Sequence, residues 1–193
     1  MGMRGPDVAL LQRRLADLHF NPGPPDGYYG YATRAALWAF QQANGIVPGT
    51  PVDKALSEAL RCPRPVRPFT SSRVPTRVEI SLRRQLMIIW SHGKVTLISH
   101  ISTGAMRSYC EFGICGFART PTGDFYVFRR YDGWQDSPLG WMYKPLYFYA
   151  GFALHGSTDV PLYPASHGCV RVPITNADLM YALVPDGTPV LIR

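Results

Sequence analysis

The sequence is poor in three features that would narrow its class at once: long apolar runs, blocks of like charge and a repeated cysteine pattern. Its longest apolar run, about Pro145 to Leu154, is far shorter than the roughly 20 residues that span a bilayer, so the chain is not expected to be membrane-spanning. Basic residues outnumber acidic ones by 20 to 13, but they are scattered. Since no nucleic-acid-binding motif accompanies them, no nucleic-acid partner is expected.

An export leader is also missing. The first residues show no succession of charged, apolar and small-residue segments. If the protein is exported, we expect that its signal peptide lies outside this sequence or that export takes another route.

The sequence does contain enough apolar material for more than one small domain. Its 193 residues are 46% hydrophobic and 17% charged, which is typical of a globular protein. That length is comfortable for two domains. Helical periodicity in the N-terminal third gives way to alternating apolar and polar residues after Arg77. The sequence therefore predicts a helical domain followed by a mostly-β domain.

Residues 1–60 are predicted to form a three-helix bundle. Asp7 is expected to cap the first helix and Thr33 the second, which Asn44-Gly45 would end. A short third helix is expected from about Asp53 to Leu60. Each helix has one apolar face, so the three can enclose a small core.

Residues 76–193 are predicted to form a β-sandwich or open barrel, with one helix after the cysteine-containing motif described below. A capping box that begins at Thr175 indicates that helix. Between the domains, residues 61–75 contain four prolines and should form a semi-rigid linker that holds the domains at a restricted separation. The expected strands are Val78–Leu82, Leu86–Trp90, Val95–Ile101, Gly123–Arg130, Gly151–His155 and Thr188–Ile192.

Two stretches of the β region fit no regular element. Residues 131–149 are dense in aromatic side chains, which could be core or a lid over a cleft. Residues 105–119 contain Cys110 and Cys115, which are close enough to form a small disulfide loop in an oxidising compartment or are two buried thiols.

The residues with the clearest chemical potential are His155-Gly156 and the run Ser166-His167-Gly168-Cys169-Val170-Arg171. A nucleophilic cysteine attacks as its thiolate and needs a nearby base or a positive field. His155 is a candidate base for Cys169, and Arg171 adds a fixed positive charge. Gly168 lets the backbone bend tightly before the cysteine. Successive backbone N–H groups at 167–169 could face a developing oxyanion.

Other interpretations of these residues remain open. A lone cysteine is usually a small buried hydrophobe, and a lone histidine is usually structural. His155, His167 and Cys169 could instead be three zinc ligands. A structural zinc site needs a fourth ligand, and no Cys-x-x-Cys or further His/Cys pair lies nearby. Two His-Gly pairs, one followed directly by cysteine, favour the nucleophile.

The motif resembles the signature of the L,D-transpeptidase catalytic domain, the cysteine acyltransferases of bacterial peptidoglycan. Two upstream pieces match the same signature, so that the resemblance extends from about Arg77 to Arg193; they are Ser102-Thr103-Gly104 and Thr120-Pro121-Thr122-Gly123. The resemblance implies the same mostly-β fold.

The resemblance also implies a role for each residue of the motif. Cys169 would be the nucleophile, His155 its base and the Gly156 carbonyl the group that orients the imidazole. The remaining residues would build the loop: His167, Gly168 and Cys169 would line the oxyanion site, and Ser166 and Arg171 would support it.

The N-terminal residues resemble a second family, the small peptidoglycan-binding domain of wall hydrolases. The similarity covers most of residues 4–60 and rests on Asp7-Val8, Leu11-Gln12, Leu15, Asp26-Gly27, Gly30, Thr33, Phe40-Gln41 and Gly45-Ile46.

Together the resemblances imply a peptidoglycan L,D-transpeptidase that needs no cofactor and no metal. A donor stem tetrapeptide would acylate the cysteine, and an acceptor amine would then take the acyl group. The expected partners are peptidoglycan stem peptides and glycan, with carbapenem β-lactams as covalent inhibitors and the exported cell-wall space as the location. The alternatives are an L,D-carboxypeptidase with the same site and a non-catalytic wall-binding protein.

Overall fold

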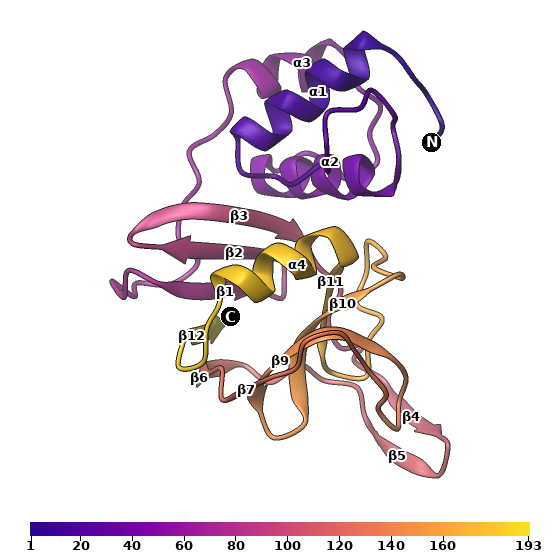
Figure 1. Cartoon of the computed structure of the whole chain (residues 1–193), viewed down its shortest axis with the longest axis vertical. Coiled ribbons are helices and arrows are strands. Elements are labelled where there is room, and N and C mark those ends of the chain that lie inside the picture. The colour runs from indigo at the N-terminus through magenta and orange to yellow at the C-terminus, as the bar shows by residue number, and fades with distance from the viewer.

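The N-terminal helices pack through one apolar stripe on each. In the computed structural model, which describes all 193 residues, they are α1 (Pro6–Asp17), α2 (Tyr31–Asn44) and α3 (Lys54–Arg61). Leu15, Phe40 and Leu56, one from each helix, are fully buried in a shared cluster. The predicted three-helix bundle is therefore confirmed (Figure 1).

The predicted N-caps of the first two helices are wrong, because glycines precede both. Gly5 precedes α1, and Asp7 lies inside its first turn. Gly30 precedes α2, and Thr33 is buried within that helix, where its hydroxyl accepts a hydrogen bond from Gln12 Nε2 at 3.0 Å. Thr33 thus links two helices instead of capping one.

The rest of the chain forms two packed sheets, one helix and a projecting hairpin. The first sheet has the order β3-β2-β1-β12-β6 and consists of β1 (Arg77–Ser81), β2 (Leu86–Ser91), β3 (Lys94–His100), β6 (Gly123–Tyr126) and β12 (Pro189–Ile192). The second has the order β11-β10-β9-β7, with β8 also on β9, and consists of β7 (Arg129–Arg130), β8 (Trp134–Gln135), β9 (Met142–Tyr149), β10 (Phe152–Ser157) and β11 (Val170–Pro173). Helix α4 (Ile174–Leu183) follows β11 directly.

The main core lies between the two sheets and α4. Val78 and Met87 from the first sheet, Leu154 and Val172 from the second and Met180 from α4 are all fully buried in one cluster. The predicted mostly-β fold with a helix after the motif is therefore confirmed.

The single strand predicted for Gly123–Arg130 is two strands in different sheets. β6 pairs with β12 in the first sheet, while β7 pairs with β9 in the second. Buried Val127 lies where the chain crosses from one sheet to the other. A strand that changes sheets keeps its alternating pattern, so the break leaves little trace in the sequence.

The predicted capping box of α4 is also wrong. Pro173 precedes the helix, no side chain caps it, and Thr175 lies in its first turn. Asp178 points away from the backbone amides and pairs with Lys144 Nζ at 2.9 Å. The acidic residue of the presumed box therefore fastens α4 to β9.

The helical bundle packs directly on the outer face of the first sheet. Along β2, Met87 and Ile89 face the core between the sheets, whereas Leu86 and Ile88 pack in the cluster of the helical domain. Across the boundary, the His100 Nδ1 and Gln42 Oε1 atoms lie 3.1 Å apart. The expectation of two domains held apart by a linker is therefore wrong, because they share a core.

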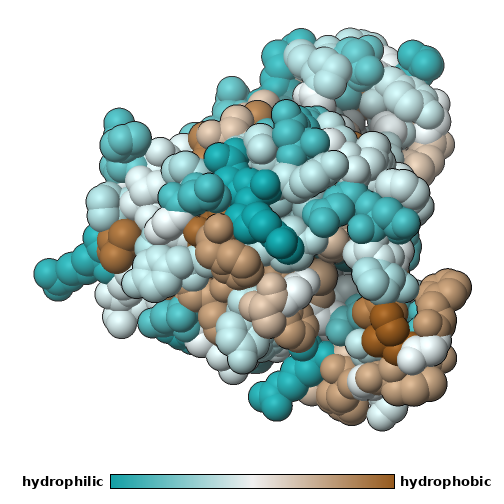
Figure 2. All heavy atoms as spheres, turned by 60° about the horizontal axis from the view of Figure 1, so that its bottom comes forward, coloured by the Kyte–Doolittle hydropathy of each residue, from teal (hydrophilic) through white to brown (hydrophobic).

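Both stretches that fit no regular element in the sequence contain strands. Residues 105–119 include the hairpin of β4 (Ser108–Glu111) and β5 (Ile114–Phe117), closed by a disulfide between Cys110 and Cys115, which confirms that pairing. Phe112 at its tip is 85% exposed, and Figure 2 shows apolar surface on the projecting lobe at the lower right. Residues 131–149 contain β8 and β9, so that most of their aromatics belong to a sheet.

No helix of the structure combines the length and the apolar character that crossing a membrane requires.

Candidate active site

Strand pairing brings the candidate base and nucleophile to one face of the second sheet. β10 and β11 are parallel, and His155 is the cross-strand partner of Arg171. Cys169 lies two residues before Arg171 and so faces the same side. His155 and Cys169 are therefore diagonal neighbours, although they lie 14 positions apart in the sequence.

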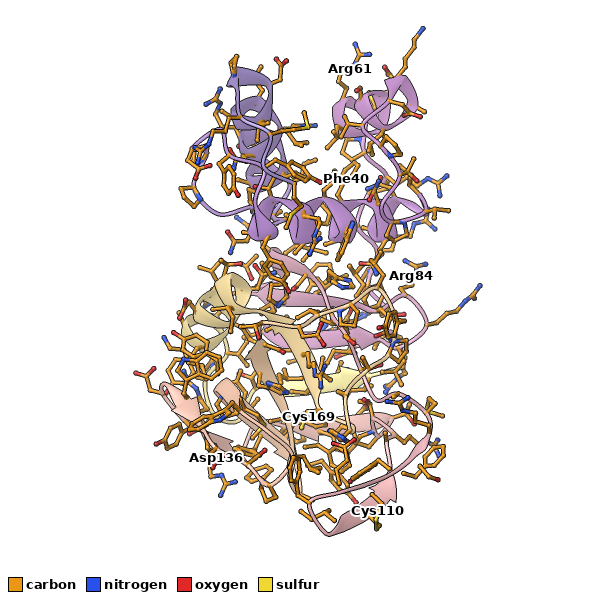
Figure 3. The ribbon with its side chains drawn as sticks, turned by 90° about the vertical axis from the view of Figure 1, so that its right-hand side faces the viewer. Phe40, Arg61, Arg84, Cys110, Asp136 and Cys169 are labelled. Atoms are coloured by element: carbon orange, nitrogen blue, oxygen red, sulfur yellow. A yellow bond between two sulfur atoms is a disulfide. The ribbon has the colours of Figure 1, made fainter.

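These side chains line a cavity of about 530 Å³. The loop from Ser137 to Trp141 forms one wall, and Tyr109 and Ile114 of the hairpin form another. Figure 3 shows Cys169 within the β-sheet part of the molecule, above the segments that bear Cys110 and Asp136. None of the 18 lining residues is an Asp or Glu, so the cavity favours anionic ligands.

The histidine is held in one neutral tautomer. His155 Nδ1 lies 3.0 Å from the Gly156 carbonyl oxygen. Because a carbonyl can only accept, Nδ1 bears the proton and Nε2 has a free lone pair. Burial lowers the pKa of His155 to about 4, so the imidazole is uncharged at neutral pH.

The cysteine is a neutral thiol at rest. Burial raises the pKa of Cys169, which outweighs the opposing effects of the Ala153 backbone and the Arg171 charge. Its sulfur lies 3.9 Å from the Gly151 carbonyl oxygen, and no hydrogen bond joins it to His155. Both groups are uncharged, so an attack by this sulfur would have to be accompanied by transfer of its proton.

Position 168 accommodates only glycine. Its φ is +138°, and a Cβ there would lie 2.4 Å from Cε1 of Phe152. The Ser166 hydroxyl accepts a hydrogen bond from the Gly168 amide at 3.0 Å and donates one to the Cys169 carbonyl. Ser166 therefore closes the turn that presents the cysteine.

The same contact corrects one expectation about the oxyanion site. Because the Gly168 amide donates to Ser166, it does not point at a substrate. The amides of His167 and Cys169 make no hydrogen bond within the loop. These two amides, and not three successive ones, are free to face a substrate oxygen.

The two upstream motif pieces surround this loop. Ser102 exchanges two backbone hydrogen bonds with Arg171, at 2.9 and 3.0 Å. The Thr120 hydroxyl donates to the Gly168 carbonyl at 2.7 Å and accepts from the Gly104 amide at 2.9 Å. Gly104 is tightly packed, since a Cβ there would lie 2.7 Å from the Ala118 carbonyl oxygen. Both pieces thus support the cysteine loop without entering the cavity.

Two acidic residues outside the cavity contact a histidine and an arginine at its edge. Glu111 Oε2 of the hairpin lies 3.2 Å from His167 Nε2, and Asp159 Oδ2 lies 3.2 Å from Arg171 Nη1. Sequence reasoning did not identify either, because no fixed spacing links them to the motif. It also did not identify Arg129, a cavity residue on a strand of two residues.

The zinc alternative lacks the required grouping. No three His, Cys, Asp or Glu side chains lie together in a way that could hold a metal ion. His155 Nδ1 contacts the Gly156 carbonyl oxygen and His167 Nε2 contacts Glu111, so neither nitrogen faces the other histidine or Cys169.

A histidine with a free Nε2, a neighbouring thiol and two unoccupied backbone amides are the groups that acyl transfer by a cysteine would use. The L,D-transpeptidase catalytic domain family matches residues 75–192, and the chain belongs to that family. A putative peptidoglycan-binding domain matches residues 4–60. The protein is thus an enzyme of the L,D-transpeptidase type with an N-terminal peptidoglycan-binding domain.

Solved structures agree with this assignment. An L,D-transpeptidase from Xylanimonas cellulosilytica is 40% identical with a TM-score of 0.91, over 100% of this chain and 95% of that one. An L,D-transpeptidase from Stackebrandtia nassauensis shares the fold at 22% identity and a TM-score of 0.58, over 100% and 93% of the two chains. One from Mycobacterium smegmatis does so at 18% identity and a TM-score of 0.50, over 62% and 58%. No curated protein sequence matches the chain.

Proposed function

We propose that the protein is a peptidoglycan L,D-transpeptidase that uses Cys169 as nucleophile and His155 as base. The observation that supports this most is the tautomer of His155, because the Gly156 carbonyl leaves Nε2 free to accept a proton. The thiol lies on the same face of the sheet, in a cavity with no acidic residue. A neutral pair of this kind becomes reactive only when a substrate carbonyl is present.

In the acylation step, the Cys169 sulfur bonds to the carbonyl carbon of the third residue of a donor tetrapeptide. The thiol proton passes to His155 Nε2. The C–N bond to the terminal D-alanine breaks, and His155 returns the proton to the departing amine. The product is a thioester on Cys169 and free D-alanine.

In the second step, an amine of an acceptor stem peptide attacks the thioester. Its proton passes to His155 and then to the departing sulfur, so that the enzyme returns to its resting state. The amides of His167 and Cys169 face the oxyanion in both steps. Water in place of the amine would give the L,D-carboxypeptidase reaction, and the ratio of cross-linked to trimmed product distinguishes the two.

The proposed location is the extracytoplasmic cell wall. The helical domain would bind peptidoglycan glycan and stem peptides there, and the Cys110–Cys115 disulfide fits an oxidising compartment. The reaction needs no cofactor and no metal. Carbapenems would acylate the same sulfur through their strained amide.

The test is covalent labelling by a carbapenem, measured by intact-protein mass spectrometry. The wild-type chain should gain one adduct, and Cys169→Ala should gain none. Cys62→Ala is the matched control, because Cys62 is an exposed free thiol far from the motif in the sequence. Labelling that persists in Cys169→Ala but is lost in Cys62→Ala would refute the assignment. Cross-linking of purified muropeptides by the wild-type enzyme then tests the acyl transfer itself.

A further inference from the structure

A row of side chains crosses the second sheet and ends at the nucleophile. Arg129 on β7 is the cross-strand partner of Tyr147 on β9, and Tyr147 is the partner of Ala153 on β10. Cys169 packs against the cluster that contains Tyr147 and Ala153. Because cross-strand partners share a face of the sheet, Arg129 and Cys169 stand at opposite ends of one row. Both line the same cavity.

Arg129 is the cavity residue whose charge has no partner. Its guanidinium makes no ion pair, whereas Arg171 is paired with Asp159 and His167 with Glu111. The Arg129 guanidinium lies over the Tyr147 ring, with its Cζ 4.2 Å from the ring centre. The Tyr147 hydroxyl donates to Gln135 at 2.9 Å, which fixes the ring. The guanidinium is therefore held in position with its hydrogen-bond donors unused.

We infer that Arg129 binds the free α-carboxylate of the donor peptide's terminal residue, the group expelled in the first step. This inference rests on the proposed function and names the part of the donor that the site selects. Guanidinium and carboxylate match in charge and in planar, bidentate geometry. With no acidic residue lining the cavity, nothing else there competes for this cation.

The distances along the row suit this arrangement. Three strand spacings separate the backbones of Arg129 and Cys169, which is roughly 14 Å. An attacking sulfur about 3.3 Å from the carbonyl carbon, one further residue and a charge-assisted hydrogen bond together span about 10 Å. The Arg129 side chain, extended over Tyr147, covers the remaining few ångströms. The leaving residue would thus lie along the row, with its carboxylate at the guanidinium.

The experiment compares two donors with the full-length enzyme: a tetrapeptide that ends in D-alanine and the same peptide that ends in D-alaninamide. Mass spectrometry of the released amine gives kcat/KM for each. The wild-type enzyme should prefer the carboxylate roughly 10- to 100-fold, the range of one hydrogen-bonded charge. Arg129→Gln should reduce that preference to near one by slowing the carboxylate donor alone, and Arg129→Lys should retain part of it. Any intrinsic difference between the donors cancels when variants are compared.

Arg83→Gln is the matched control, because Arg83 is exposed on the β1–β2 turn and makes no ion pair. It removes the same charge from the protein and should leave the preference unchanged. Equal losses on both donors in Arg129→Gln, or a preference that survives this substitution, would overturn the inference. A wild-type enzyme that uses both donors equally would overturn it too, whereas one that uses neither would refute the proposed function beneath it.

Discussion

The carboxylate of Glu111 lies 3.2 Å from the imidazole of His167 and so joins the disulfide-closed hairpin to the cysteine motif. The Tyr109 ring, on the same hairpin, lies 4.7 Å from the His167 ring in an edge-to-face arrangement. His167 is therefore held by the hairpin, whereas His155 is buried on the same face as the thiol. The two histidines of the motif should have different roles.

The first prediction concerns the pair itself. Glu111→Gln should lower the carbapenem acylation rate by less than about fivefold, since this partly exposed contact would contribute at most about 1 kcal/mol even with both side chains charged. Replacing both Cys110 and Cys115 with Ser should lower the rate further, because a free hairpin no longer orders Tyr109. Stopped-flow acylation measures both. Complete loss of acylation in Glu111→Gln would mean that a charged His167 takes part in the chemistry.

The second prediction separates the histidines. His155→Ala should slow acylation by roughly two to four orders of magnitude, the usual contribution of a positioned acid–base group. His167→Ala should slow it by less than about tenfold, because its ring is directed to Glu111 and its backbone amide is retained. The same acylation assay compares them, with thermal unfolding as a check that both variants fold. The reverse order of effects would identify His167 as the base.

Much of the site was predictable because the motif is local. Ser166, Gly168 and Cys169 form one short turn and lie within four positions of one another in the sequence. His155 likewise contacts its neighbour, Gly156. Partners supplied by other elements were not predictable. Glu111, Asp159 and Arg129 reach the site through a hairpin, a loop and a two-residue strand, whose positions depend on the assembled sheets.

In the fold, too, local features were predictable from the sequence and features that depend on distant elements were not. The alternation of apolar and polar residues predicted most strands. It continues through the point after Tyr126 where the chain passes from one sheet to the other, so the sequence did not predict that break. The packing of the helical domain on the sheet is reflected in the sequence. The continuous apolar run Leu86–Trp90 means that both faces of β2 are covered, as in buried strands generally. The proline-rich linker suggested that the two domains are separated, whereas the apolar run Leu86–Trp90 indicates that the helical domain covers the sheet.

The third prediction is a loss of stability in acid. Burial lowers the pKa of both His155 and His100 to about 4. In the unfolded chain their pKa values are near 6.5, so between pH 6.5 and 4 the unfolded state binds protons that the folded state does not. The free energy of unfolding is therefore fully retained above pH 6.5 and falls as the pH decreases, by up to about 3 kcal/mol for each histidine.

Urea unfolding at a series of pH values tests this prediction. His100→Gln removes one of the two titrations, and its glutamine can still donate a hydrogen bond toward the Val160 carbonyl that His100 Nε2 contacts at 3.1 Å. The slope of stability against pH between 6.5 and 4 should fall by about one proton in this variant. An identical slope in both proteins would show that His100 titrates normally in the folded state.

The last prediction follows from the shared core of the two domains. A chain that starts at Arg73 keeps every residue proposed for chemistry but uncovers Leu86, Ile88 and Ile98, which are at most 1% exposed in the full chain. Exposing a large apolar side chain costs roughly 1.5–3 kcal/mol, so these three together should destabilise the fragment by several kcal/mol. The melting temperature should fall by about 10 °C or more, or the fragment should aggregate.

The control is the same fragment with Ile88→Thr and Ile98→Thr, which makes the uncovered face more polar. It should be more soluble than the parent fragment, and its carbapenem acylation should survive, because the cysteine loop lies on the other sheet. The same two substitutions in the full chain should instead lower its stability, since there they lie beneath the helices. A fragment as stable as the full chain would show that the helical bundle is only tethered to the catalytic domain, and sedimentation with purified peptidoglycan would then measure its separate contribution to wall binding.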